Sequence, residues 1–171
     1  MPSRDADADI VRLHPKRTRA GWHGTRLVLA ATLLAGCEGA GARPPEPSFI
    51  PVGGNTALPF SAAVRVGDML YLAGQLGTDS TGKLVSGGIG PETRQAMENI
   101  RAVVERNGSS MDRVVKCLVM LADMGEWGAM NAVYVAFFPT AFPARSAMGA
   151  NGLALGARVE IECLAVASGR E

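Results

Sequence analysis

Glycine and proline dominate residues 39–59, which read GAGARPPEPSFIPVGGNTALP. Such a composition has no hydrophobic periodicity and favours loops and extended linkers. We therefore expect residues 37–57 to be a tether and residues 58–168 to form one folded domain. A domain of that size must bury its core with few elements. In the whole chain of 171 residues, 47% are hydrophobic, which is typical of a globular protein.

A basic stretch and an uncharged apolar stretch precede the tether. Residues 14–26 contain no acidic side chain, and residues 27–36 (LVLAATLLAG) carry no charge. The apolar stretch is about half as long as a membrane-spanning helix, but it matches the core of a signal peptide. It runs into the sequence LAGC at residues 34–37, which resembles the lipobox of bacterial lipoproteins.

This pattern predicts export and lipidation. Residues 1–36 would be a signal peptide, and Cys37 would carry the lipid after cleavage. Glu38 follows where an aspartate would indicate retention in the inner membrane, so a periplasmic protein anchored to the outer membrane is expected. Two alternatives are a short buried helix and a translation start placed too far upstream.

The charges and histidines argue against several function classes. The chain has 17 basic and 16 acidic residues, a balance that predicts a solvated surface and no nucleic-acid partner. Both histidines, His14 and His23, precede the tether, so the predicted domain has none. This argues against a Ser-His-Asp triad, a Cys-His pair and an ordinary zinc site, and we predict no metal.

The hydrophobic pattern of the domain predicts an α/β sandwich. AAVRV and MLYLAG flank Gly67-Asp68, a pair typical of a tight β-hairpin. Between Pro91 and Gly108, apolar residues recur every three or four positions, as in an amphipathic helix. A second such helix is expected over 126–138, with strands over 114–121, 143–148 and 157–167. The order ββαβαββ implies a mixed sheet with both helices on one face.

The last strand indicates how the sheet is covered. Val159, Ile161, Cys163 and Ala165 can face the helices, because they alternate with a second set of side chains. That second set begins with Glu160 and Glu162 and ends with aliphatic residues, so the far face is neither fully polar nor fully apolar. Two helices cannot cover both faces of a sheet. We therefore expect the far face to be buried in a homo-oligomer.

Five segments in this order and spacing resemble the RidA/YjgF family of imine deaminases. They are YLAGQLG, TRQAMENIRAVVERNGSSMDRVVK, MNAVYVAFF, FPARS and VEIE, and the resemblance covers residues 58–167. It implies a chorismate-mutase-like fold, with a mixed six-stranded sheet and two helices on one face. It also implies a homotrimer whose ligand clefts lie between adjacent subunits. The implied activity is the hydrolysis of small 2-imino acids to 2-keto acids and ammonia, without a cofactor.

The resemblance assigns the two charged site residues. Arg145, in FPARS, would bind the substrate carboxylate, and its planar fork suits two parallel charge-assisted bonds. The alternative for Arg145 is a structural ion pair with Glu160 or Glu162. Glu160 would be the catalytic acid/base, delivering water to the C=N carbon and a proton to nitrogen. The alternative for the two glutamates is a pair of exposed carboxylates.

Four further positions match less specific family features. Gly74 corresponds to a glycine that lines the cleft, or is a strand glycine needed for close packing. Asn131 corresponds to a cleft-side asparagine, or ties a helix to a loop. Phe60 replaces a tyrosine and Ala147 replaces a cysteine or threonine, so both substrate-binding positions lack a polar group. These changes leave side-chain specificity and rate undecided.

Two questions stay open at this level. The implied fold places Cys117 and Cys163 side by side, where we expect two small core thiols in preference to a disulfide. The second question is whether the domain is an enzyme. The alternative function is a non-catalytic periplasmic trimer that binds small carboxylates in the same cleft.

Overall fold

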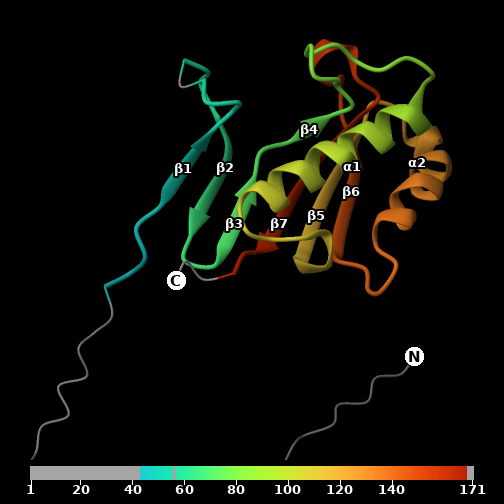
Figure 1. The fold of residues 1–171 in the computed structure, drawn as a ribbon. Helices are drawn as coiled ribbons and strands as arrows, with labels where there is room; N and C mark the ends of the chain where they lie inside the picture. The colour runs from blue at the N-terminus through green and yellow to red at the C-terminus, as the bar shows by residue number, and fades with distance from the viewer. Residues whose placement is uncertain (1–42, 56, 169–171) are drawn as a thin grey trace, which may run out of the picture. The chain divides into compact units, whose positions relative to one another are not determined.

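The computed structural model describes residues 43–55 and 57–168. Figure 1 shows a twisted sheet with both helices on one face. This confirms the predicted mixed α/β fold with two helices. The helices are α1 (Ile89–Arg106) and α2 (Trp127–Tyr134), and the strands are β1 (Ser48–Pro51), β2 (Ser61–Val66), β3 (Met69–Leu72), β4 (Gln75–Leu76), β5 (Val114–Leu121), β6 (Ala144–Gly149) and β7 (Val159–Val166). Four short 3-10 turns cover Met111–Arg113, Met124–Glu126, Val135–Phe137 and Ala154–Gly156.

The sheet has seven strands in the order β1-β2-β3-β7-β5-β6, and β4 also pairs with β7. Only β5 and β6 are parallel to one another; the other pairs are antiparallel. The predicted hairpin is confirmed, since β2 and β3 pair across Gly67-Asp68. Gly67 has a φ of +57°, a left-handed conformation that glycine adopts without a steric penalty.

The structure differs from the sequence analysis in the expected tether. Ser48–Pro51 forms the edge strand β1, in which Phe49 pairs with Val64 of β2. Ile50 packs against the core, whereas Phe49 on the other side of the strand is 68% exposed. Pro51 fits because an edge strand tolerates a residue without an N–H. The sheet has seven strands, because β1 and the short β4 join the five strands that the hydrophobic pattern predicted, whereas the resemblance implied six. The predicted signal peptide and Cys37 lie outside the described residues.

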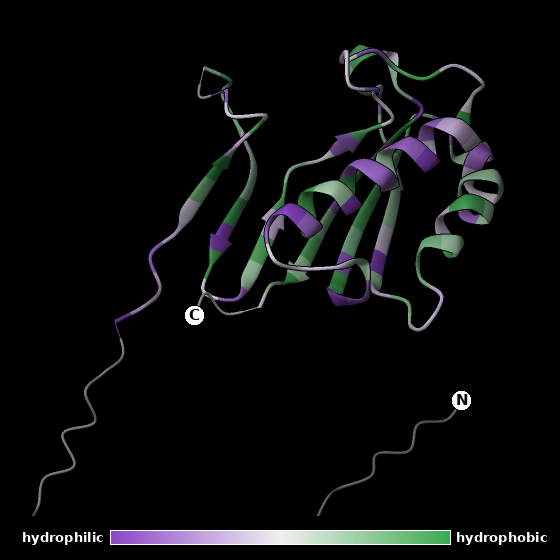
Figure 2. Ribbon diagram, viewed as in Figure 1, coloured by the Kyte–Doolittle hydropathy of each residue, from purple (hydrophilic) through white to green (hydrophobic). Residues whose placement is uncertain are grey.

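The core lies between the helices and the sheet. On α1 the predicted apolar stripe is buried, with Ala96, Met97, Ile100 and Val104 all at 0% exposure. Figure 2 shows apolar residues along the strands beneath α1, whereas polar residues are frequent on the helix itself. The alternation predicted for β7 is confirmed, because Val159, Ile161, Cys163 and Ala165 are all at most 1% exposed. Within the described residues, no helix has both the length and the hydrophobicity needed to span a membrane.

Cys117 and Cys163 form a disulfide in the core. The expectation of two free thiols is therefore wrong for this structure. The two residues are direct partners of β5 and β7, and their Cα atoms are 4.1 Å apart. Opposed residues of an antiparallel pair come this close where they exchange no backbone hydrogen bonds, which brings the sulfur atoms together.

Candidate functional site

Arg145 is half-buried on β6 and faces the helices. It is the register partner of Cys117, whose side chain lies in the core, and neighbouring partners in a sheet point to the same face. Its Nη1 donates a hydrogen bond to Oδ1 of Asn131 at 2.6 Å. Its Cζ lies 4.8 Å from the ring centre of Tyr134 and 5.4 Å from that of Trp127. Arg145 is thus held by an amide and two aromatic rings.

All three of these groups come from α2. Trp127, Asn131 and Tyr134 are four and three residues apart, a spacing that places side chains on one face of a helix. The helix follows a short 3-10 turn whose N-cap is Asp123, which accepts a hydrogen bond from the N–H of Gly125. The structure thereby brings the predicted residue Asn131 to Arg145. Trp127 and Tyr134 appeared in the sequence only as part of an apolar helix face.

Arg145 makes no salt bridge within the described residues. The three salt bridges found there join Arg65 to Asp68, Arg101 to Glu98 and Arg158 to Glu126. The alternative expected from the sequence, an ion pair of Arg145 with Glu160 or Glu162, is therefore not formed. A half-buried guanidinium with neutral neighbours is a strong candidate for an anion site.

A small cavity of about 310 Å³ adjoins the guanidinium. Arg145 and Asn131 supply its polar groups, and the other lining residues are Tyr134, Val135, Phe142 and Pro143. Burial raises the pKa of Tyr134 to about 12, and the nearby Arg145 guanidinium partly opposes this rise. A cavity with one cation, one amide and apolar walls suits a small carboxylate.

Glu160 lies on the opposite face of the sheet, beside Gly74. Its neighbours Val159 and Ile161 are buried under the helices, so the side chain of Glu160 points away from them. A Cβ atom on Gly74 would lie 2.0 Å from Oε1 of Glu160. Glycine at position 74 therefore makes the room that the carboxylate occupies.

Gly74 belongs to a β-bulge. Tyr71 pairs with Leu164, and Gln75 pairs with Ile161. Between these two pairs the chain advances by four residues from β3 to β4 but by only three residues along β7. The extra residue separates β3 from β4 and interrupts their common ladder on β7. Bulges of this kind often lie beside functional sites, where they redirect a side chain.

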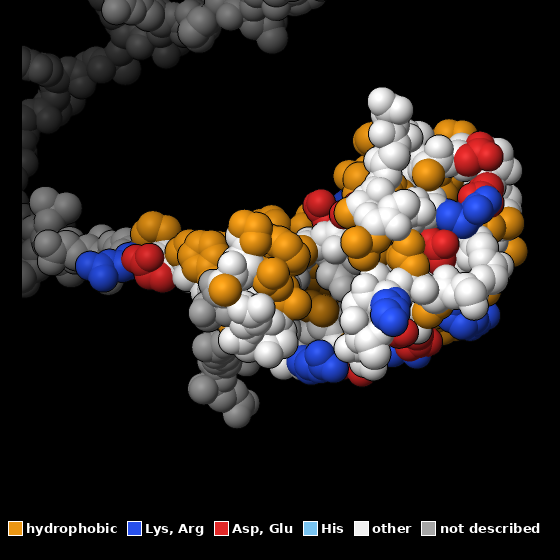
Figure 3. Space-filling view, turned by 90° about the horizontal axis from the view of Figure 1, so that it is seen from above, with side chains coloured by type: hydrophobic (Ala, Val, Ile, Leu, Met, Phe, Trp, Pro, Cys, Tyr) orange, Lys and Arg blue, Asp and Glu red, His pale blue; other side chains and the backbone are white. Residues whose placement is uncertain are grey.

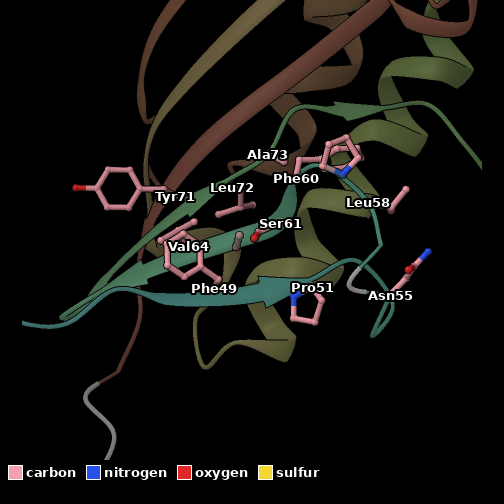
Figure 4. Close-up of a pocket in the computed structure, with 12 residues that line it drawn as sticks. Phe49, Pro51, Asn55, Leu58, Phe60, Ser61, Val64, Tyr71, Leu72 and Ala73 are labelled. Atoms are coloured by element: carbon pink, nitrogen blue, oxygen red, sulfur yellow. The ribbon is translucent and has the colours of Figure 1, made fainter.

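Phe60 is 56% exposed and lies between two cavities. With Gly74, Leu58 and Leu155 it lines a cavity of about 890 Å³, whose polar lining comes from α1 and from β4 and the loop that follows it. On its other side lies a groove of about 630 Å³, shown in Figure 4, which is also lined by Phe49 and Tyr71. In Figure 3, hydrophobic side chains gather over this β1–β2 side of the molecule.

The site residues expected from the sequence therefore fall into two groups. Arg145 and Asn131 lie together on the helix face, and Ala147 follows Arg145 by two residues on the same face and packs against the core. Glu160 and Gly74 lie together at the bulge, and Phe60 shares a cavity with Gly74. Within residues 43–55 and 57–168, no cluster of three or more His, Cys, Asp or Glu side chains could hold a metal ion.

Comparison with known proteins shows the family of this chain. Residues 54–167 match a family model described as endoribonuclease L-PSP. The mouse 2-iminobutanoate/2-iminopropanoate deaminase is 42% identical over 109 residues, which cover 63% of this chain and 81% of the mouse protein. The human deaminase of the same name is 40% identical over 109 residues, with 63% and 80% covered. These names match the predicted deaminase type.

Solved structures show the same fold. The Escherichia coli YjgF structure has a TM-score of 0.64 and 30% identity, and the match covers 70% of this chain and 98% of that one. RidA from the Antarctic bacterium Psychrobacter has a TM-score of 0.61 and 35% identity, with 72% and 98% covered. The chain therefore belongs to the RidA/YjgF family, whose family model carries the description endoribonuclease L-PSP.

Proposed function

We propose that the protein is an imine/enamine deaminase that hydrolyses small 2-imino acids to 2-keto acids and ammonia. The observation that carries this proposal is the guanidinium of Arg145, which adjoins a small cavity and has no carboxylate partner among the described residues. A 2-imino acid supplies the missing carboxylate. The activity named for the mouse and human relatives supports the same chemistry.

Arg145 would bind and orient the substrate. Its Nη1 is held by Asn131, which fixes the plane of the guanidinium. A planar carboxylate can accept two parallel hydrogen bonds from such a group. The C=N carbon of the substrate is then held at a fixed distance from Arg145, and the reaction becomes effectively intramolecular.

Glu160 would carry the proton transfers. Its carboxylate would take a proton from water as the water oxygen bonds to the C=N carbon, and the carboxyl group would then give that proton to the nitrogen. In the resulting carbinolamine, Glu160 would take the hydroxyl proton and give it to the nitrogen, and the C–N bond would then break to release ammonia. The sum is imine plus water giving ketone plus ammonia, and Glu160 returns to its starting state.

We place this chemistry between subunits of a homotrimer. Arg145 and Glu160 lie on opposite faces of one sheet, so two chains are needed to bring them to one small substrate. The far face supports such an assembly, because large apolar side chains are exposed on it, among them Phe49, Tyr71 and Met148. Exposed apolar area of this extent marks an interaction surface.

A second candidate function is a trimeric module that binds small carboxylates without catalysis. It is favoured by Phe60 and Ala147, which place a ring and a methyl group where the family often has polar side chains. Arg145 would then serve binding alone. Glu160 would have no role in proton transfer.

One experiment separates the two. An amino-acid oxidase generates the imine from 2-aminobutyrate in the assay, and the decay of the imine is followed with and without the purified protein. A deaminase accelerates the decay, whereas a carboxylate-binding module leaves it unchanged. Binding of 2-oxobutanoate, measured by calorimetry, is expected in both cases.

We also propose that the protein acts in the periplasm, anchored by a lipid on Cys37. The basic stretch, the uncharged core and the LAGC sequence support this location. The disulfide between Cys117 and Cys163 is consistent with it, because such bonds persist in oxidising compartments and are rare in the cytosol.

A further inference from the structure

Every group that holds Arg145 is electrically neutral. The hydrogen-bond acceptor on Nη1 is the amide oxygen of Asn131, and the two rings near Cζ belong to Trp127 and Tyr134. Tyr134 stays uncharged well above neutral pH, since burial raises its pKa to about 12. Among the described residues, therefore, no carboxylate compensates the positive charge of the guanidinium.

A half-buried cation without a carboxylate needs another source of stabilisation. Aromatic faces supply one, because the ring quadrupole attracts a cation without neutralising it. A carboxylate in the place of Asn131 would also hold Arg145, but it would compensate the positive charge that attracts an incoming anion. The neutral amide of Asn131 and the two rings thus fix the position of the guanidinium without compensating its charge.

We propose that Trp127 and Tyr134 are positioning residues for Arg145, and that the strength with which this chain binds a carboxylate depends on the lack of charge on the three α2 side chains that hold Arg145. The inference rests on the proposed function, since it takes the ligand of Arg145 to be a 2-imino or 2-keto acid. The rings hold the guanidinium from α2, and its N–H groups not bonded to Asn131 remain for the ligand.

The hydroxyl of Tyr134 supports a role for the ring and not for the oxygen. Among the described side chains, it is the one buried polar atom without a hydrogen-bond partner. A buried hydroxyl without a partner destabilises the fold, so hydrogen bonding does not explain a tyrosine here. The ring itself packs in the core and lies 4.8 Å from Cζ of Arg145 and 5.0 Å from the ring of Phe138.

Asn131→Asp gives the sharpest test. The side chain keeps its shape but gains a negative charge on the group that accepts from Nη1. We expect a higher melting temperature, because the buried cation gains a counter-ion. We also expect the affinity for 2-oxobutanoate, measured by calorimetry, to fall at least about tenfold, because the ligand now competes with an internal carboxylate.

Ring-deletion variants test the positioning role. Trp127→Leu and Tyr134→Leu should each weaken 2-oxobutanoate binding by about 3- to 30-fold, in line with a lost cation–π contact. Tyr134→Phe keeps the ring face and should recover the affinity that Tyr134→Leu loses. Phe137→Leu is the matched control, because Phe137 packs against Arg101 at 5.0 Å in a pair outside the site. It should lower the melting temperature without weakening binding.

The outcomes are distinct. If the wild type binds no 2-oxobutanoate, the proposed function fails and the inference fails with it. If the wild type binds it and the folded ring-deletion variants bind equally well, only the positioning role is overturned. Should these variants fail to fold, Asn131→Asp decides: unchanged affinity in that variant overturns the inference.

Discussion

Arg145 and Glu160 lie on opposite faces of the same sheet. Arg145 pairs with the core residue Cys117 and contacts α2, whereas Glu160 alternates with the buried residues Val159 and Ile161 and lies beside the bulge. A 2-imino acid is too small to reach through a sheet. If both residues act on one substrate, they come from different chains, which makes the assembly part of the site.

This arrangement predicts complementation between inactive variants. Arg145→Ala and Glu160→Gln should each be nearly inactive alone, because every cleft then contains one defect. After co-refolding at equal amounts, about one quarter of the clefts in a randomly mixed cyclic trimer should combine an intact Arg145 with an intact Glu160. We expect about one quarter of wild-type activity to return in the imine-decay assay.

The control is a mixture assembled from variants refolded separately, which should stay inactive. Light scattering on the wild type should give the mass of a trimer. A stable monomer, or a mixture that recovers no activity although both variants co-assemble, would contradict the inter-subunit site.

Single substitutions separate binding from proton transfer. Arg145→Lys keeps the charge but loses the planar fork, so it should raise KM and weaken 2-oxobutanoate binding. Glu160→Gln keeps the shape but loses the proton-transfer group, so it should lower kcat by about 10²- to 10⁴-fold with binding largely retained. Steady-state kinetics and calorimetry on the same preparations check both. Wild-type kcat in Glu160→Gln would remove the enzyme proposal.

The sequence predicted those elements that depend on turn residues and on hydrophobic periodicity within a single segment. The pair Gly67-Asp68 closes the hairpin, and the stripe from Ala96 to Val104 is the buried face of α1. The strand β1 was missed because it has only four residues, one of them proline, in a segment of tether-like composition. Its pairing with β2 depends on the rest of the sheet and not on its own sequence.

The site was predictable only in part, for a similar reason. The alternation along β7 placed Glu160 on the far face, but nothing in FPARS indicated that Arg145 faces the helices, or that β5 separates the two strands. Trp127 and Tyr134 have the spacing of core residues, and their contact with Arg145 arises only when α2 packs over β6. The disulfide depends on the pairing of Cys117 with Cys163, 46 residues apart.

Gly74 should be intolerant of a side chain. A Cβ atom there would overlap the carboxylate of Glu160, so Gly74→Ala should displace that group and lower kcat by at least about tenfold. Gly128→Ala is the matched control, because a Cβ on this α2 residue meets nothing within 4 Å. That change should raise the free energy of unfolding by about 0.5–1 kcal/mol and leave kcat unchanged. Equal kcat for both variants would argue against a role for Glu160 at its observed position.

The lipid anchor can be tested in cells. Metabolic labelling with a fatty acid should mark the wild-type protein, and the protein should fractionate with membranes. Cys37→Ser should lose both the label and the membrane retention, because it removes the thiol that we propose to carry the lipid. Identical cytoplasmic fractionation of the two forms would show that residues 1–36 are not a working leader.

The disulfide gives the last prediction. Closing a loop between Cys117 and Cys163 restricts the unfolded chain, so Cys117→Ala/Cys163→Ala should lower the free energy of unfolding by about 2–4 kcal/mol in denaturant titrations. Dithiothreitol should lower the stability of the wild type by a similar amount and leave that of the double variant unchanged. Because Cys37 is the one other cysteine in the chain, protein that begins after residue 37 should show no free thiol when it is unfolded without reductant. Two titratable thiols in protein purified from the periplasm would contradict the bond, and with it one argument for an oxidising compartment.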